Sequence, residues 1–188
     1  MRTDTPIAPP LRAELFSVER MERHGPVLAA SHALLATRVR DRLLARLSDN
    51  QHALLDAGTR LKSALDANQR LAPAAEWLLD NFYLVEEQVR TARRHLPKAY
   101  SRELPRLASG PSAGLPRAYD IAAEAVAHGD GHVAPDGLRR FVAAYQAVVP
   151  LHLGELWAIP IMLRLALIEN LRRVADRIVA GTLAREHA

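Results

Sequence analysis

Apolar side chains recur at every third or fourth residue along most of this 188-residue chain, and this spacing limits the fold more than any other feature. A spacing near 3.6 residues places these side chains on one face of an α-helix, whereas a half-buried strand requires alternation at every second residue. No stretch of the chain sustains such alternation, and valine and isoleucine, which favour strands, are sparse. The sequence therefore predicts an all-α fold.

Proline and glycine divide the helical pattern into segments. A flexible arm is expected over residues 1–10, and a short helical pattern over residues 11–24 ends at Gly25-Pro26. Longer helices are then expected over residues 26–47, 49–65, 73–95, 117–128, 135–149 and 155–179. The expected architecture is an antiparallel helical bundle or array of about six helices, in a single domain over residues 11–183.

Residues that start and stop helices stand near several of these boundaries. Ser48 or Asp49 can cap the second long helix, and Pro73 suits the first turn of the third. Residues 96–116 hold four prolines and two glycines, which forbid a long helix. This segment is predicted to be one long loop, of a length that is often functional or mobile.

The composition excludes several classes of site and partner. The chain has no cysteine, which excludes disulfides and thiolate metal sites. A net charge of +4, with 21 acidic residues interspersed among 25 basic ones, does not indicate nucleic-acid binding. The most apolar run, residues 156–168, is interrupted by Pro160 and Arg164 and is shorter than the ~20 residues of a membrane span. We therefore expect neither a nucleic-acid partner nor a membrane-spanning helix.

Two segments are distinctive enough to indicate a family. Residues 75–90 read AEWLLDNFYLVEEQVR, and the pattern continues through residues 93–107. Residues 140–173 contain RFVAAYQ, then LGELWAIPIMLR and IENLRR. Together with ELFS at residues 14–17, these segments resemble the beginning of the bacterial cyclic β-1,2-glucan synthases, also grouped as glycosyltransferase family 36. The resemblance covers roughly residues 11–178.

The resemblance implies that such a chain works within a much larger protein. These synthases are large inner-membrane enzymes that use UDP-glucose, and their glycosyltransferase, cyclising and phosphorylase-like domains lie beyond the segment that this chain resembles. What it implies for this chain is a non-catalytic accessory or scaffold module, with the other domains of the enzyme as partners. It also implies a cytoplasmic location, at the inner face of the inner membrane through the parent enzyme.

Charged residues near the end of the 73–95 helix allow two interpretations. Glu86 and Glu87 point about 100° apart, so they cannot form an opposed acid–base pair by themselves. Glu87 lies three residues before Arg90, and Arg90 lies four before Arg94, which favours a chain of surface ion pairs. The alternative is a groove that binds an anion or a sugar nucleotide. The loop residues that would join such a groove are Lys98, Arg102 and Arg106.

Three residues of the most apolar helix are further binding candidates: Glu155, Trp157 and Arg164. An unpaired charge in a core costs several kcal/mol, so a buried Arg164 requires a partner. We expect that partner to be Glu86 or Glu87. Such a network more often sets the register of helices than performs catalysis.

A site for carbohydrate or UDP-glucose is the alternative function, and it needs an aromatic platform. The candidates are Trp77, Tyr83, Tyr100, Tyr145 and Trp157. Because aromatic residues make up only 5% of the chain, we expect the tryptophans to anchor the core instead.

No motif indicates a catalytic centre, a metal or a cofactor. Residues 128–132 read HGDGH, which offers metal ligands but is better explained as a turn between helices. The sequence contains no glycine-rich phosphate loop, HExxH motif or nucleophile elbow. Its spacing also does not ensure the two facing carboxyl groups that glycosidase chemistry requires. We therefore expect no catalytic residue, no metal and no cofactor.

Overall fold

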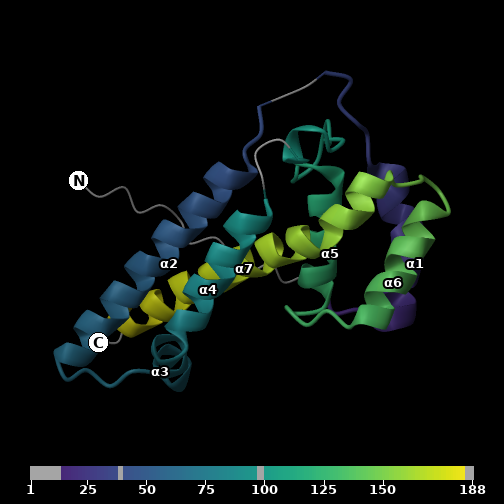
Figure 1. The fold of residues 1–188 in the computed structure, drawn as a ribbon. Helices are drawn as coiled ribbons and strands as arrows, with labels where there is room; N and C mark the ends of the chain where they lie inside the picture. The colour runs from purple at the N-terminus through teal and green to yellow at the C-terminus, as the bar shows by residue number, and fades with distance from the viewer. Residues whose placement is uncertain (1–13, 38–39, 97–99, 185–188) are drawn as a thin grey trace.

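The computed structural model describes residues 14–37, 40–96 and 100–184, and its regular structure is helical throughout (Figure 1). The α-helices, in chain order, are α1 (Val18–Ser31), α2 (Leu43–Asp66), α3 (Pro73–Asp80), α4 (Phe82–His95), α5 (Arg117–His128), α6 (Pro135–Gln146) and α7 (Leu153–Ala184). A short 3-10 helix, η1 (Tyr100–Arg102), lies between α4 and α5. The predicted arm over residues 1–10 lies outside the described residues.

The all-α prediction is confirmed, because no strand occurs in the described part of the chain. Seven α-helices are described where the sequence predicted about six. The helix predicted over residues 117–128 is found at those bounds, and the last helix extends beyond its predicted ends. The antiparallel bundle arrangement and the single domain over residues 11–183 stay predictions.

The 32-residue helix α7 runs across the molecule and joins two packed halves (Figure 1). In the first, which we call the α2–α4 half, α2, α3 and α4 pack along α7. Its core is rich in leucine and includes Leu47, Leu54, Leu61, Leu78 and Leu165. In the second, the α1–α6 half, α1 packs against α6, and α5 contacts α7. Its core includes Met21, Leu28, Ile121, Phe141 and Tyr145.

Helix α1 continues through Gly25-Pro26, so the predicted helix end at this dipeptide is wrong. The physical reason lies in α6. A Cβ atom on Gly25 would stand 2.9 Å from the carbonyl oxygen of Phe141 and 2.9 Å from the backbone nitrogen of Tyr145. The glycine therefore permits close approach of two helices rather than ending one. It also has no Cβ to clash with the ring of Pro26, which relaxes the usual restriction on the residue before proline.

The helix predicted over residues 26–47 does not form as one unit. Residues 32–37 are not helical, and α2 begins only at Leu43. Oδ1 of Asp41 accepts a hydrogen bond from the backbone N–H of Leu43 at 3.1 Å. It thereby gives a partner to one of the first N–H groups of α2, which have none within the helix. Ser48 and Asp49 lie inside α2, and their predicted role as caps is wrong.

The helix predicted over residues 73–95 is broken at Asn81 into α3 and α4. The Asn81 side chain donates from Nδ2 to the carbonyl oxygen of Trp77 at 2.8 Å, so the amide competes with the helical backbone at this point. The break leaves both pieces packed against α7. The start at Pro73 is confirmed, because this proline occupies the first turn of α3.

Residues 100–116, the part of the predicted 96–116 loop described after the gap, pack against the segment before α2. Leu107 forms an isolated antiparallel bridge with Leu34, and Leu104 and Leu115 are buried. The buried Arg106 guanidinium donates to Oδ1 of Asp41 at 3.1 Å. Because this guanidinium is engaged inside the fold, Arg106 is not available to the anion groove suggested by the sequence. Lys98 lies outside the described residues.

Candidate functional site

An apolar groove of about 430 Å³ runs between α3–α4 and α7 in the α2–α4 half. Trp77, Asn81, Leu84, Val85 and Gln88 of α3, the junction and α4 form one wall; Pro160, Leu163, Arg164, Leu167, Ile168 and Leu171 of α7 form the other. Successive residues of each wall are separated by one, three or four positions, so each wall follows one helical face. The groove therefore lies where the apolar faces of α3–α4 and α7 contact each other along one edge and remain uncovered along the other.

Both tryptophans lie at the surface, and the prediction that they anchor the core is wrong. Trp77 is 60% exposed at the groove, and Trp157 is 73% exposed on α7. Trp157 lies three residues before Pro160 and seven before Arg164, on the face of α7 that lines the groove. The apolar surface therefore extends beyond the groove itself along α7.

Arg164 reaches across the groove to α4. Its Nε donates to Oε1 of Gln88 at 3.1 Å. The predicted ion pair with Glu86 or Glu87 is not formed, and both glutamates are exposed on α4. Arg164 is half-buried, so its guanidinium keeps contact with water and does not require a carboxylate.

Four of the predicted binding residues are exposed outside the groove. Glu87, Arg90 and Arg94 lie on α4, and Arg102 ends η1. In the described part of the chain, no ion pair joins Glu87 to Arg90 or Arg94. The structure does not bring these four residues to Glu155, Trp157 and Arg164. Their role in binding stays a prediction.

Glu155 is buried at the start of α7 and forms an ion pair that the sequence did not indicate. Its carboxylate accepts from Nε of Arg117 at 2.9 Å and from Nη2 at 2.6 Å. Burial alone would lower the pKa of Arg117, but the hydrogen bonds and charge of Glu155 outweigh it and hold this pKa above its ordinary value. This bidentate pair is a structural contact between α5 and α7.

A second buried carboxylate, Glu169, joins α2, α5 and α7. Arg46 donates to it from Nε and Nη2, both at 2.6 Å, and the hydroxyl of Tyr119 donates at 2.7 Å. Nη2 of Arg173 donates to it as well, at 2.6 Å. Burial alone would raise the pKa of Glu169, but these donors, with Arg46 foremost, lower the pKa of this carboxyl to about 2.

One sequence signal could have located both carboxylates. Glu155 and Glu169 are fourteen residues apart, which places them on one face of α7 after two heptads. The same face carries the buried Ala158, Met162 and Leu165. A glutamate in an otherwise apolar stripe indicates a buried carboxylate, but the pattern does not say which arginine meets it.

The α1–α6 half holds a third set of polar contacts. The ring of His32 contacts the hydroxyl of Tyr145 through Nδ1 at 2.8 Å and Oδ2 of Asp120 through Nε2 at 3.0 Å. Tyr145 is buried, so it does not offer the aromatic platform considered from the sequence. These contacts tie the end of α1 to α5 and α6.

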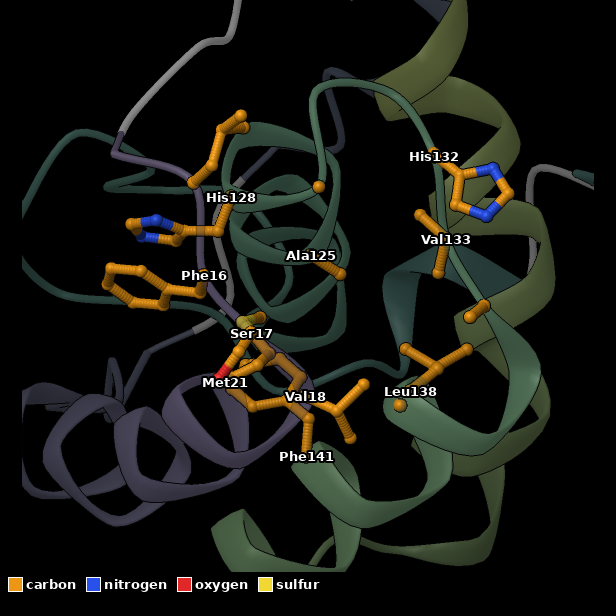
Figure 2. A pocket seen from close by; sticks show the side chains of 14 residues that line it. Phe16, Ser17, Val18, Met21, Ala125, His128, His132, Val133, Leu138 and Phe141 are labelled. Atoms are coloured by element: carbon orange, nitrogen blue, oxygen red, sulfur yellow. The ribbon is translucent and has the colours of Figure 1, made fainter.

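A smaller pocket of about 260 Å³ lies in this half, between the start of α1, α5 and α6 (Figure 2). Phe16 and Met21 border one side, and Val133 and Leu138 border the other. His128 and His132 also line it. Residues 128–132 form the turn predicted from their glycines, with a positive φ of 51° at Asp130.

A search of curated proteins connects this chain to a large enzyme. Over 169 residues, 34% are identical to the cyclic β-(1,2)-glucan synthase NdvB of Rhizobium meliloti (strain 1021), and the match covers 89% of this chain. This chain is similar to a segment of that synthase. The match spans only 6% of the synthase's own length. It confirms the resemblance indicated by residues 75–107 and 140–173. No protein-family model matches the chain.

Among the described residues, no helix combines the length and the apolar character needed to cross a bilayer.

Proposed function

We propose that this chain is a non-catalytic helical module of a cyclic β-1,2-glucan synthase-like protein, and that its groove receives an amphipathic helix from another segment of that protein. The observation that carries the proposal is the groove between α3–α4 and α7, with Trp77 exposed in it. A chain similar to 6% of a synthase's length would have many neighbouring segments in such a protein. The proposal places the module at the cytoplasmic side of the inner membrane with its parent enzyme.

The shape and lining of the groove favour a helix as its occupant. Its two walls are helical faces, and a third helix can lay an apolar face between them with anchors at i, i+3, i+4 and i+7. Leu84, Leu167 and Leu171 supply apolar contact on both walls. Exposed apolar surface of this kind marks protein contact sites more often than it stands alone.

The charge in the groove further limits the occupant. Arg164 donates to a neutral amide, Gln88, so this contact brings no opposite charge to its guanidinium. A glutamate or aspartate near the middle of the incoming apolar face would form a charge-assisted hydrogen bond with Arg164. We therefore propose an occupant helix that is apolar on one face with one acidic residue in it.

A matched pair of substitutions tests this proposal. Leu167 in the groove and Leu55 on α2 are both 38% exposed, so Leu167→Glu and Leu55→Glu make the same chemical change at the same exposure. Each would be placed in a chimera in which this chain replaces the matching segment of the Rhizobium meliloti synthase. Glucan synthesis in isolated membranes is then measured. We expect Leu167→Glu to reduce it at least about tenfold, because the incoming helix would have to bury the new carboxylate and would lose Arg164 to it, at a cost above about 1.4 kcal/mol.

The outcomes of this experiment separate the alternatives. Equal glucan synthesis by both variants of an active chimera would refute the groove as a docking site. Circular dichroism of the isolated chain checks that Leu167→Glu still folds, and a substitution at an exposed position is expected to change stability little. Conversion of UDP-glucose by the isolated chain would refute the non-catalytic role.

A second function, the binding of glucan or UDP-glucose, is favoured by the exposure of Trp77 in the groove that contains Arg164 and of Trp157 on the same face of α7. An exposed indole can stack on a sugar ring or a uracil, and a guanidinium can bind a diphosphate. Calorimetric titration with UDP-glucose, UDP and β-1,2-glucans tests it. Saturable binding that Trp77→Ala and Trp157→Ala weaken, while Tyr83→Ala on α4 does not, would establish this function. An absence of heat at millimolar ligand would exclude it.

A further inference from the structure

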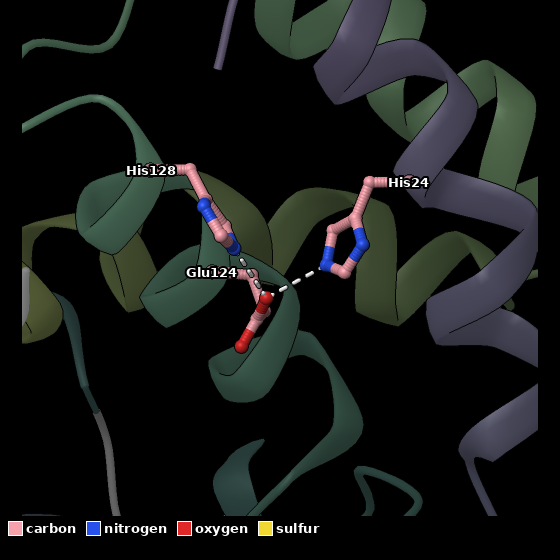
Figure 3. Close-up of side chains that lie close together, drawn as sticks. All are labelled: His24, Glu124 and His128. Atoms are coloured by element: carbon pink, nitrogen blue, oxygen red, sulfur yellow. Dashed lines mark hydrogen bonds and ion pairs between the residues drawn. The ribbon is translucent and has the colours of Figure 1, made fainter. Parts of the chain in front are cut away.

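Two histidines and a glutamate converge in the α1–α6 half, away from the groove. His24 projects from α1, and Glu124 and His128 project from one face of α5, where they are four residues apart (Figure 3). One side-chain ligand atom from each residue lies within 4.8 Å of the others. Nε2 of His24 is 2.7 Å from Oε2 of Glu124, and Nε2 of His128 is 3.2 Å from the same oxygen.

The surroundings of His128 determine which of its nitrogens can bind a ligand. Nδ1 lies 2.6 Å from the backbone carbonyl oxygen of Glu14. A carbonyl oxygen only accepts hydrogen bonds, so Nδ1 carries the hydrogen and donates it. In the neutral ring, the lone pair is then on Nε2, which faces Glu124. Metal-binding histidines are held by the same type of contact, from the second nitrogen to a carbonyl or carboxylate.

Aromatic packing fixes the orientation of both imidazoles. The ring of Phe16 stacks on His128 with centroids 3.7 Å apart, and its edge meets His24 at 5.5 Å. On the other side, Phe141 lies parallel to His24 at 6.2 Å. The backbone N–H of Phe16 donates to the carbonyl oxygen of His128 at 3.1 Å, so the stacking residue is itself attached to α5. The imidazoles are thus pre-arranged rather than free side chains on a surface.

We propose that His24, Glu124 and His128 bind a divalent transition metal of the zinc type, through Nε2 of each histidine and a carboxylate oxygen. In a tetrahedral zinc site, bonds of about 2.0–2.1 Å separate neighbouring ligand atoms by about 3.3 Å. The two nitrogen–oxygen distances of 2.7 and 3.2 Å are close to that separation, so small side-chain rotations suffice. Two imidazoles select against Mg²⁺ and Ca²⁺, which prefer oxygen ligands.

A bound metal would join α1 to α5. The three ligands leave the fourth tetrahedral position open, and all three side chains are partly exposed, so water can occupy it. The ligands come from positions 24, 124 and 128, and binding would therefore stabilise a contact between segments 100 residues apart. This inference uses none of the groove residues and does not depend on the proposed docking function.

Titration of the purified, metal-free full chain with Zn²⁺, Co²⁺ and Mg²⁺ tests the site by calorimetry. We expect one saturable site for Zn²⁺ and Co²⁺ and none for Mg²⁺. His24→Gln, Glu124→Gln and His128→Gln should each weaken binding at least about tenfold. His52→Gln and His95→Gln, at exposed positions on α2 and α4, are the matched controls and should leave it unchanged. Binding that the controls weaken equally, or no Zn²⁺ binding at all, would overturn the proposal.

A gain of signal keeps the proposal testable if a glutamine variant folds poorly. The chain has no cysteine, so His24→Cys introduces a single thiol at the proposed site. With Co²⁺ bound, this variant should show a thiolate-to-cobalt charge-transfer band, and Glu124→Gln in the same chain should weaken Co²⁺ binding. A control thiol, His52→Cys, should give no band. A folded His24→Cys chain without the band would show that these residues form only an ion-pair cluster.

Discussion

The two halves of the molecule differ in how closely their helices pack. In the α2–α4 half, α3, α4 and α7 leave a groove of about 430 Å³ with Trp77 exposed in it. In the α1–α6 half, the helices approach so closely that Gly25 meets the backbone of α6, and polar side chains pair with one another across the helices. The first half therefore has the larger apolar groove, whereas the second packs its helices more closely and holds a smaller pocket of about 260 Å³.

The difference shows where a partner is needed and where it is not. A helix pair that packs backbone to backbone has no room for a further helix, and its polar groups already have partners. A helix pair separated by a groove can accept one. Helix α7 belongs to both halves. Its buried Glu155 connects it to α5, and its buried Glu169 connects it to both α2 and α5.

The largest expected effect comes from the contact that joins the halves. Glu169→Ala removes the acceptor that Arg46 and the Tyr119 hydroxyl share, and Glu169 is only 3% exposed. The Arg46 side chain is 41% exposed and can turn to water, so the cost comes mainly from the buried Tyr119 hydroxyl and from the lost charge-assisted hydrogen bonds. We expect a loss of about 3 kcal/mol in the free energy of unfolding. Urea unfolding measures the change. Glu87→Ala, at an exposed position of α4, is the control and should change stability by less than about 0.5 kcal/mol.

Acid should weaken the same contact without a mutation. The pKa of Glu169 is lowered to about 2 in the folded protein, below the ordinary value of 4.5. Its contribution to stability is therefore complete above about pH 4.5 and is lost as the pH falls towards 2. Unfolding free energies between pH 6 and pH 2 should fall more steeply for the natural chain than for Glu169→Gln. Parallel profiles would contradict this assignment.

The close approach of α1 and α6 gives a smaller effect. Gly25→Ala adds a Cβ atom 2.9 Å from two backbone atoms of α6, which cannot move aside as a flexible side chain would. We expect a loss of about 1–3 kcal/mol from overpacking. Gly181→Ala is the matched control, because a Cβ atom there meets no atom within 4 Å. It should stabilise α7 by up to about 1 kcal/mol. Thermal melts of both variants measure the contrast.

The smallest effect is expected in the groove. Gln88→Ala removes the acceptor of Arg164, but the half-buried guanidinium can turn to water. The isolated chain should lose less than about 0.5 kcal/mol in urea unfolding. A loss above about 2 kcal/mol would show that the Gln88–Arg164 contact holds α4 and α7 together. The groove would then be a structural interface like the contacts of the α1–α6 half, and the two halves would not differ in this respect.

Local patterns predicted much of the helical structure but not its interruptions. The 3.6-residue spacing identified α5 at its bounds and placed the starts of α3 and α6 at Pro73 and Pro135. It missed the break at Asn81, where one side-chain amide competes with the backbone. It also interpreted Gly25-Pro26 as a helix end. Both errors arise because a residue that can end a helix is also one that can serve a contact within or between helices.

The candidate site was predicted only in part, for a related reason. Arg164 and Trp157 were predicted as binding residues of the most apolar helix, and the structure places Arg164 in the groove with Trp157 on the same face of α7. Their expected burial was wrong, because the hydrophobic pattern shows that a residue shares a face but not whether another helix covers it. That depends on the angle and spacing of α3, α4 and α7.

The sequence by itself determined the helical class, the lack of any cysteine chemistry and the similarity to a segment of a cyclic glucan synthase. Helix periodicity and composition are properties of neighbouring residues, so they can be read without the fold. Only the tertiary structure decided that Glu155 meets Arg117, 38 residues away, and that His24 meets Glu124, 100 residues away. The partner of a buried charge is set by helix packing, which brings together residues that the local pattern leaves unrelated.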